Sequence, residues 1–202
     1  MKKPVAFLDF QGTLGGIGTD DITSFDFYPF SVKAIQLLNQ NGILAIGITN
    51  QSHISQGIIT MEEYLRKIQM LQDQLTSKEA CLDAIYCCPH SHRDQCNCKK
   101  PLTGMIEKAQ EQFDLDMDKA YVIGDMGKTD IILANRINAK GILVLTGVGY
   151  GSLHEYRHTW KDIEADYIAD NVLDAVQWII NDPNKLVSVN KGSASNDMVL
   201  EM

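Results

Sequence analysis

Four potential metal ligands lie close together near the middle of the sequence. They are three cysteines and one histidine, at Cys88, His90, Cys96 and Cys98. Zinc prefers thiolate and imidazole ligands, and four of them complete its tetrahedral shell with no position left for a substrate. The sequence therefore predicts a structural zinc ion that holds a loop. His92 could replace His90 as the fourth ligand, because both lie on the same loop.

The elements that must position this loop alternate along the sequence. Short apolar runs predict buried parallel strands at residues 5–8, 43–48, 84–87, 121–123 and 142–145, with an edge strand near 167–168. Helical spacing predicts helices at residues 32–39, 61–75, 104–113, 130–137 and 172–180. This alternation predicts one α/β domain over residues 1–184, built on a doubly wound, Rossmann-like parallel sheet. The polar composition of residues 185–202 predicts a mobile tail.

Composition excludes several classes of partner. The chain has 202 residues and a formal net charge of -8, which opposes binding to nucleic acid or to an anionic membrane. Small phosphorylated ligands remain possible at a local basic site. Five cysteines, most of them near the predicted zinc site, indicate a reducing compartment, with Cys81 and Cys87 expected as buried thiols. We see neither a signal peptide nor a membrane-length apolar run, and expect a cytoplasmic protein.

Polar residues stand directly after several of the predicted strands. Asp9, Thr49 and Asp125 follow the first, second and fourth strands, and Lys100 follows the predicted zinc ligands. Ligands of open parallel sheets bind at the carboxyl ends of the strands, near the point where strand order reverses. We therefore expect these residues to share one site. The remaining histidines, His53, His154 and His158, are expected at the surface.

Four motifs occur in the order found in the haloacid dehalogenase-like (HAD) phosphohydrolases. They are Asp9-Phe10-Gln11-Gly12-Thr13-Leu14, Thr49-Asn50-Gln51-Ser52, the Cys/His loop that ends in Lys99-Lys100-Pro101, and Gly124-Asp125 with Asp130. From about residue 5 to residue 147 the sequence resembles this family. Within it, the sequence is similar to the zinc-loop branch of subfamily IIIA, which contains heptose bisphosphate and histidinol phosphatases. Because no long insertion interrupts the motifs, we expect no separate cap domain.

The resemblance implies a role for each motif residue. Asp9 is expected to attack phosphorus and form an aspartyl phosphate, with Mg²⁺ held by Asp9 and Asp125. Two carboxylates would repel a phosphate dianion unless a hard cation lay between them. The further implied roles are catalysis and metal binding for Gln11, support of the magnesium site for Asp130, phosphoryl binding for Thr49, pairing with Asp9 for Lys100, and substrate binding for Thr13, Asn50, Gln51 and Lys99.

Gln11 departs from the pattern of the family. Active members usually carry a second aspartate at this position, which protonates the leaving oxygen and then activates water. An amide has no titratable proton near neutral pH, and loss of general acid–base help costs about 10²- to 10⁴-fold in rate.

Three hypotheses follow from this departure. In the first hypothesis, the chain is a slow phosphatase for a small phosphorylated metabolite such as a phosphosugar. In the second hypothesis, Gln11 is a natural or introduced substitution whose reversal restores activity. In the third, the chain is a sensor or scaffold that binds a phosphorylated ligand without turnover.

Overall fold

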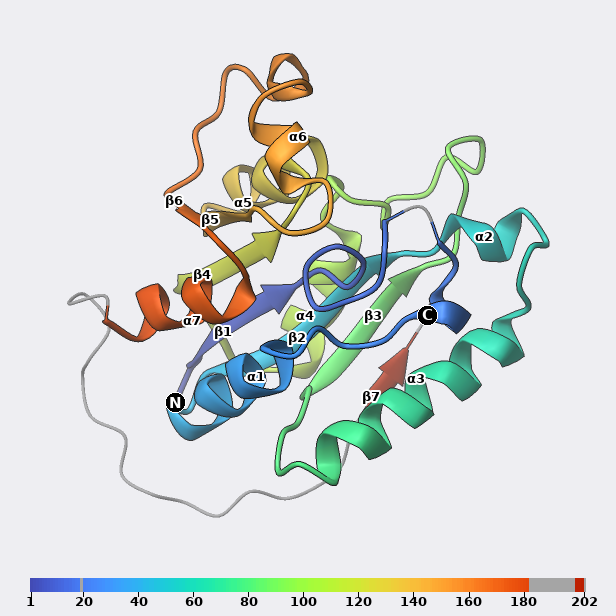
Figure 1. The fold of residues 1–202 in the computed structure, drawn as a ribbon, viewed down its shortest axis with the longest axis horizontal. Helices are drawn as coiled ribbons and strands as arrows, with labels where there is room; N and C mark the ends of the chain where they lie inside the picture. The colour runs from blue at the N-terminus through green and yellow to red at the C-terminus, as the bar shows by residue number, and fades with distance from the viewer. Residues whose placement is uncertain (19, 182–198, 202) are drawn as a thin grey trace.

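A parallel β-sheet forms the middle layer of the computed structural model, which describes residues 1–18, 20–181 and 199–201 (Figure 1). In this part of the chain the sheet has seven strands in the order β6-β5-β4-β1-β2-β3-β7, and every neighbouring pair is parallel. The strands are β1 (Lys3–Leu8), β2 (Leu44–Asn50), β3 (Ala84–Cys88), β4 (Leu115–Gly124), β5 (Lys140–Val144), β6 (Tyr167–Ala169) and β7 (Val199–Glu201).

Helices connect the strands and cover both faces of the sheet. The α-helices are α1 (Ser31–Gln40), α2 (Ser52–Ser55), α3 (Met61–Thr76), α4 (Gly104–Gln112), α5 (Ile132–Arg136), α6 (Gly149–Leu153) and α7 (Val172–Asn181). Short 3-10 turns are η1 (Ile22–Ser24) and η3 (Arg157–Thr159), and η2 (Gly127–Ile131) is a π-helical turn. Helices α1, α3 and α7 lie on the near face in Figure 1, and α4 lies behind the sheet.

Alternating side chains of the strands build two hydrophobic cores. In β1, Ala6 and Leu8 pack with α1, α3 and α7, whereas Val5 and Phe7 pack with α4 and α5. All four side chains are fully buried. A strand covered on both faces needs apolar residues at successive positions, which is why the sequence shows continuous apolar runs instead of alternation.

Helix α3 shows how local sequence signals begin an element. Thr60 precedes the helix, and its hydroxyl accepts a hydrogen bond from the Glu63 backbone N–H at 3.1 Å. The Glu63 carboxylate accepts the Thr60 backbone N–H at 2.7 Å in return. This capping box satisfies two backbone donors that the helix leaves open. It fixes the start of the helix that covers β2 and β3.

The strand order places the functional edge of the sheet. Strand β1 lies in the centre, with β2 on one side and β4 on the other, so the direction of winding reverses between β1 and β4. Ligands of doubly wound sheets bind outside the carboxyl ends of the strands at such a reversal. The carboxyl ends of β1, β2 and β4 lie there, at Leu8, Asn50 and Gly124.

The predicted fold class is confirmed, with differences in detail. Each of the six predicted strands is present, whereas β7 was not predicted. The helix predicted over residues 130–137 begins as the π-helical turn η2 and continues as α5. Cys87 is buried as expected, but the prediction for Cys81 is wrong, because it lies exposed on the turn before β3.

Two further predictions concern the ends of the domain and its surroundings. Most of the predicted mobile tail, at residues 185–198 and 202, lies outside the described residues. No helix in the described part of the chain is long and apolar enough to cross a membrane.

The connections that could carry a cap domain are short. Between β2 and β3 the described chain forms only α2 and α3, and between β1 and α1 only η1.

Candidate active site

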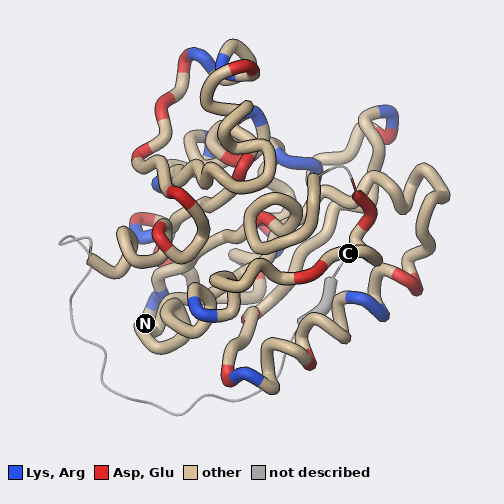
Figure 2. Tube along the Cα trace, in the orientation of Figure 1, with Lys and Arg blue, Asp and Glu red and all other residues tan. Residues whose placement is uncertain are grey.

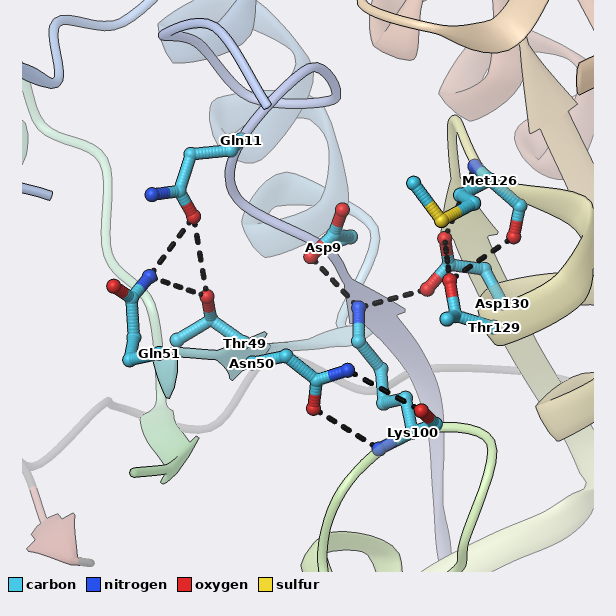
Figure 3. A network of polar contacts seen from close by, with 9 residues as sticks. All are labelled: Asp9, Gln11, Thr49, Asn50, Gln51, Lys100, Met126, Thr129 and Asp130. Carbon is cyan, nitrogen blue, oxygen red and sulfur yellow. Dashed lines mark hydrogen bonds and ion pairs between the residues drawn. The ribbon is translucent and has the colours of Figure 1, made fainter. Parts of the chain in front are cut away.

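A buried lysine joins two carboxylates at the carboxyl end of the central strand. Asp9 directly follows β1, and its Oδ1 lies 2.7 Å from Lys100 Nζ. Lys100 Nζ also lies 2.7 Å from Asp130 Oδ1 (Figure 3). Lys100 is only 4% exposed and Asp130 is fully buried. One ammonium group therefore holds two acids that come from separate segments of the chain.

The electrostatics of this cluster follow from burial. Burial raises the pKa of Asp9 to about 6 although Lys100 opposes the shift, and Asp130 raises it further. Burial also opposes the charge of Lys100, but Asp130 and Asp9 outweigh it, so the pKa of Lys100 lies above its ordinary value. Lys100 is thus a fixed cation whose charge is set by its two partners.

A third carboxylate, Asp125, completes the group from the end of β4. Ligand oxygens of Asp9, Asp125 and Asp130 all lie within 4.8 Å of one another. Burial, then Asp9 and Asp130, raises the pKa of Asp125 well above its ordinary value. If all three acids are ionised, a single lysine leaves an excess of negative charge, which a divalent cation would offset. Their all-oxygen donor set fits a hard cation such as Mg²⁺.

Two glycines bring the backbone close to the Asp125 carboxylate. A Cβ atom at Gly12 would lie 2.0 Å from Asp125 Oδ2, and one at Gly147 would lie 2.2 Å from the same oxygen. Both glycines have positive φ, of 83° and 58°. Asp125 Oδ2 accepts the Val148 backbone N–H at 2.8 Å. The loops after β1 and β5 therefore fix the orientation of Asp125.

A second network, made of neutral groups, lies on the β2 side of Asp9. Gln51 Nε2 donates to Gln11 Oε1 and to Thr49 Oγ1, each at 2.8 Å. Thr49 Oγ1 also donates to Gln11 Oε1 at 3.4 Å. Gln11 Nε2 donates to the Asp20 carbonyl oxygen at 3.2 Å. These contacts orient the Gln11 amide, and Figure 3 shows it pointing toward Gln51.

Asn50 connects strand β2 to the backbone that carries Lys100. Its Oδ1 accepts the Lys100 N–H at 3.0 Å, and its Nδ2 donates to the Lys100 carbonyl oxygen at 3.3 Å. Lys99 points elsewhere, because its Nζ donates to Ser52 Oγ and, at 3.1 Å, to the His90 carbonyl oxygen. The loop from Cys88 to Lys100 is therefore attached to Asn50, the last residue of β2, and to Ser52 just after it.

The predicted zinc ligands form one cluster in this loop. Ligand atoms of Cys88, His90, Cys96 and Cys98 lie within 4.8 Å of one another. Cys88 Sγ lies 3.7 Å from Cys96 Sγ and 3.6 Å from His90 Nδ1, and His90 Nδ1 lies 3.2 Å from Cys98 Sγ, closer than in a regular tetrahedron. A tetrahedron with zinc–ligand bonds of about 2.3 and 2.1 Å requires separations of roughly 3.7 and 3.6 Å. The cluster thus fits zinc, with His90 and not the exposed His92 as its imidazole.

The structure also shows the burial and the contacts of Thr13, Asp130 and the three histidines outside the zinc loop. Thr13 is fully buried, and its hydroxyl has no hydrogen-bond partner among the described residues. Asp130 uses both carboxylate oxygens within the protein, since Oδ2 accepts the Met126 N–H and the Thr129 hydroxyl. His154 and His158 are exposed as expected, whereas His53 is partly buried and lines a pocket beside Gln11.

Sequence reasoning missed the groups that hold these side chains. Ser52 anchors Lys99, the Val148 N–H binds Asp125, and Gly147 makes room for it. Two signals could have found them: Ser52 ends the Thr49-Asn50-Gln51-Ser52 motif, and glycines at 147, 149 and 151 follow the fifth strand at close spacing.

Comparison with known proteins agrees with this geometry. Residues 97–175 match the model of the HAD-hydrolase-like family. The D-glycero-beta-D-manno-heptose-1,7-bisphosphate 7-phosphatase of Yersinia pestis is 33% identical over 157 residues, which cover 71% of this chain and 81% of the relative. The chain belongs to the HAD-like hydrolases. The family prediction is thereby confirmed, as is the predicted class of a HAD-superfamily phosphatase.

Further HAD relatives match over nearly their whole length. The D-glycero-D-manno-heptose-1,7-bisphosphate 7-phosphatase of Thermosynechococcus vestitus is 32% identical over 193 residues, covering 89% of this chain and 96% of the relative. A solved D,D-heptose 1,7-bisphosphate phosphatase from B. bronchiseptica, complexed with magnesium and phosphate, superposes with a TM-score of 0.79 at 24% identity. That likeness covers 89% of this chain and 98% of the solved chain and supports the HAD fold.

Proposed function

We propose that the chain is a magnesium-dependent phosphomonoester hydrolase that acts on a small phosphorylated sugar through an aspartyl phosphate on Asp9. The observation that carries this proposal is the buried group of Asp9, Lys100, Asp125 and Asp130 at the strand reversal. A scaffold would not need three acids and a lysine in one buried site. Such groups are costly to bury unless they are paired or bind a cation.

Asp9 is oriented for attack on phosphorus. Lys100 binds its Oδ1, and Figure 3 shows the other carboxylate oxygen directed away from the lysine. In the first step a carboxylate oxygen forms a bond to phosphorus while the bond from phosphorus to the leaving oxygen breaks. In the second step water attacks the same phosphorus, which releases inorganic phosphate and restores the Asp9 carboxylate. Bound Mg²⁺ would neutralise charge on the phosphoryl oxygens.

Lys100 and the β2 segment have supporting roles in this proposal. The Lys100 ammonium group would hold the nucleophile in place and stabilise negative charge in buried surroundings, where such an interaction is stronger than in water. Thr49 is fully buried at the end of β2, and its hydroxyl lies in the network with Gln11 and Gln51. Zinc in the Cys88–Cys98 loop would be structural, because its four ligands leave no open position. Its contribution is to hold the backbone immediately before Lys99 and Lys100.

Gln11 limits the proton transfers of both steps. Its amide cannot give a proton to the leaving oxygen or take one from water, so solvent must do so. Turnover should therefore be slow for alkyl phosphates and faster for esters whose leaving groups need no protonation. The same amide favours a second candidate function, in which the site binds a phosphorylated ligand and does not hydrolyse it.

The test is rapid-quench detection of a phosphoenzyme with an activated aryl phosphate in Mg²⁺. We expect a phosphorylated chain to accumulate and then to release phosphate slowly, and we expect a chelator to abolish both signals. A parallel panel of sugar phosphates identifies the substrate. Absence of both phosphoenzyme and phosphate release contradicts the hydrolase. Calorimetric binding of a sugar phosphate that is not hydrolysed would then identify the second candidate.

A further inference from the structure

A buried tryptophan packs against the turn that carries Asp130. Trp160 lies directly after η3 and is 3% exposed. It belongs to the segment between β5 and β6, which is drawn in orange in Figure 1. A Cβ atom at Gly127, the first residue of η2, would lie 2.2 Å from Trp160 Cε2 and 2.4 Å from its Nε1. The indole ring therefore lies directly against the backbone at the start of η2.

Two buried hydrogen bonds through Ser152 accompany this contact. Trp160 Nε1 donates to the Ser152 carbonyl oxygen at 3.0 Å. The Ser152 hydroxyl oxygen accepts the Gly127 backbone N–H at 2.7 Å. Ser152 is only 2% exposed, so water does not readily replace either partner. Because a buried N–H without an acceptor is unfavourable, Ser152 fixes the position of Gly127.

The short helix that contains Ser152 also holds Asp125. Val148 stands immediately before α6, and its backbone N–H donates to Asp125 Oδ2 at 2.8 Å. The Val148 carbonyl oxygen accepts the Ser152 N–H at 2.7 Å. One helical turn thus binds Asp125 at its start and Gly127 through Ser152. These contacts hold the backbone from Asp125 to Asp130, which carries two of the three acids at the proposed cation site.

The contact with η2 is made by neutral groups. Helix α6 has no charged residue. The exposed charged residues that follow it include Glu155, Lys161 and Asp162. Figure 2 shows blue and red positions on this outer part of the segment. Arg157, whose guanidinium carbon lies 4.0 Å from the centroid of the Trp160 ring, is paired with Glu164. Ser152 and Trp160 can therefore hold the turn without adding a charge of their own.

We propose that Trp160 is a positioning residue for the divalent cation. By packing on Gly127 and binding Ser152, it holds Asp125 and Asp130 in the arrangement that the cation needs. If this support is weakened, only a fraction of the molecules has that arrangement, and the apparent affinity for the cation falls by the same fraction. The inference rests on the proposed function for the identity of the cation as Mg²⁺. It concerns cation affinity and not the chemistry at Asp9.

The test is calorimetric titration of Mg²⁺ into the unaltered chain and into Trp160→Phe, with thermal melting recorded without Mg²⁺. Phenylalanine keeps a ring beside Gly127 but cannot donate to the Ser152 carbonyl oxygen. We expect the dissociation constant for Mg²⁺ to rise about 2- to 10-fold, the effect of one hydrogen bond. At saturating Mg²⁺ the rate of hydrolysis should approach that of the unaltered chain, because the bound cation then selects the competent arrangement.

Trp178→Phe is the matched control. Trp178 is the second tryptophan of the chain and lies on α7, where its ring stacks on Tyr167 with centroids 5.0 Å apart. It packs against a different hydrophobic cluster from the one that contains Trp160. This control should lower the melting temperature and leave the dissociation constant for Mg²⁺ unchanged.

A second pair of variants tests the contact without changing the indole ring. Ser152→Ala removes the acceptor of the buried Gly127 N–H and should raise the dissociation constant for Mg²⁺ at least about 5-fold. Ser31→Ala is its control, because Ser31 is fully buried and its hydroxyl has no hydrogen-bond partner among the described residues. Alanine is small and suits a helix, so this pair decides the question if Trp160→Phe does not fold.

The outcomes separate this inference from the proposed function. If Trp160→Phe folds and binds Mg²⁺ as tightly as the unaltered chain, its role is only structural and the inference fails, even if the chain hydrolyses esters through Asp9. An unaltered chain that binds no Mg²⁺ also overturns it. If Trp160→Phe and Ser152→Ala lose affinity and their controls do not, but the unaltered chain forms no phosphoenzyme, the proposed hydrolase fails and the inference stands.

Discussion

The two sides of Asp9 differ in charge and in what they can do to a phosphate ester. Toward β4 lie a lysine and two further carboxylates, all buried and charged or titratable. Toward β2 lie Gln11, Gln51 and Thr49, which are neutral and bound to one another. The β4 side can hold a cation and a nucleophile, whereas the β2 side can orient groups but cannot transfer protons. The β4 side thus has the groups for cation binding and attack, and the neutral β2 network supplies no acid–base group beside them.

The largest effect should come from removing the nucleophile. Asp9→Asn is expected to lower hydrolysis of an activated ester by at least about 10⁴-fold, as for other covalent nucleophiles. Rapid-quench measurement should find no phosphoenzyme. Asp118→Asn is the control, because Asp118 is exposed near the start of β4 and remote from the site. Retention of most of the activity in Asp9→Asn would exclude Asp9 as the nucleophile.

A carboxylate at position 11 should give the β2 side the acid and base that it lacks. Gln11→Asp is expected to raise kcat for an alkyl phosphate by about 10²- to 10⁴-fold, because it supplies the missing acid and base. The gain should be much smaller for an aryl phosphate, whose leaving group needs no proton. Steady-state rates with the two ester types check this difference. An equal gain for both types would show that the change acts on binding and not on proton transfer.

Loss of one zinc ligand should loosen the segment that carries Lys100. Cys96→Ser is expected to lower zinc affinity by at least about 100-fold and to reduce the melting temperature and the activity together. Metal analysis and thermal melting measure the two effects. Cys81→Ser is the matched control, since Cys81 is an exposed thiol outside the cluster. If Cys96→Ser behaves like this control, the loop does not depend on a metal.

The smallest effect should come from removing the hydrogen bonds between the Asn50 side chain, at the end of β2, and the Lys100 backbone. Asn50→Ala removes both side-chain hydrogen bonds to the Lys100 backbone. Each is worth about 0.5–1.5 kcal/mol, so a fall of about 10-fold in kcat/KM is expected as Lys100 loses its fixed position. Zinc content should not change. A variant with normal activity would show that the zinc loop alone positions Lys100.

The sequence predicted the β4 side of the site better than the β2 side. Asp9 and Asp125 were expected at one site from their positions after buried strands, and Lys100 from its position after the predicted zinc ligands. The role of Asp130 was implied by the resemblance to the HAD family, and its carboxylate lies with the other three groups. The hydrogen bonds among Gln11, Thr49 and Gln51 depend on side-chain rotamers, which no spacing rule specifies. The direction taken by Lys99 depends likewise on a single hydroxyl, that of Ser52.

Within the fold as well, elements with a clear sequence pattern were predicted and others were missed. The central strands were predicted because each is buried on both faces and leaves a continuous apolar run. The π-helical turn at η2 was missed, because only its last two residues fall in the helix predicted over residues 130–137, and apolar spacing does not distinguish a π-helical turn from an α-helix. The exposure of Cys81 was missed because a lone cysteine carries no periodic pattern.

The surroundings of Asp125 determine what is needed to build this site into another protein. Its carboxylate occupies a space that exists only because two backbone bends, at Gly12 and Gly147, lack side chains. If the three acids and the lysine were placed on a different scaffold, the Asp125 carboxylate would lack the backbone that surrounds it here. The transferable unit is therefore the loops after β1, β4 and β5 together with the segment that carries Lys100, and the side chains alone would not reproduce it.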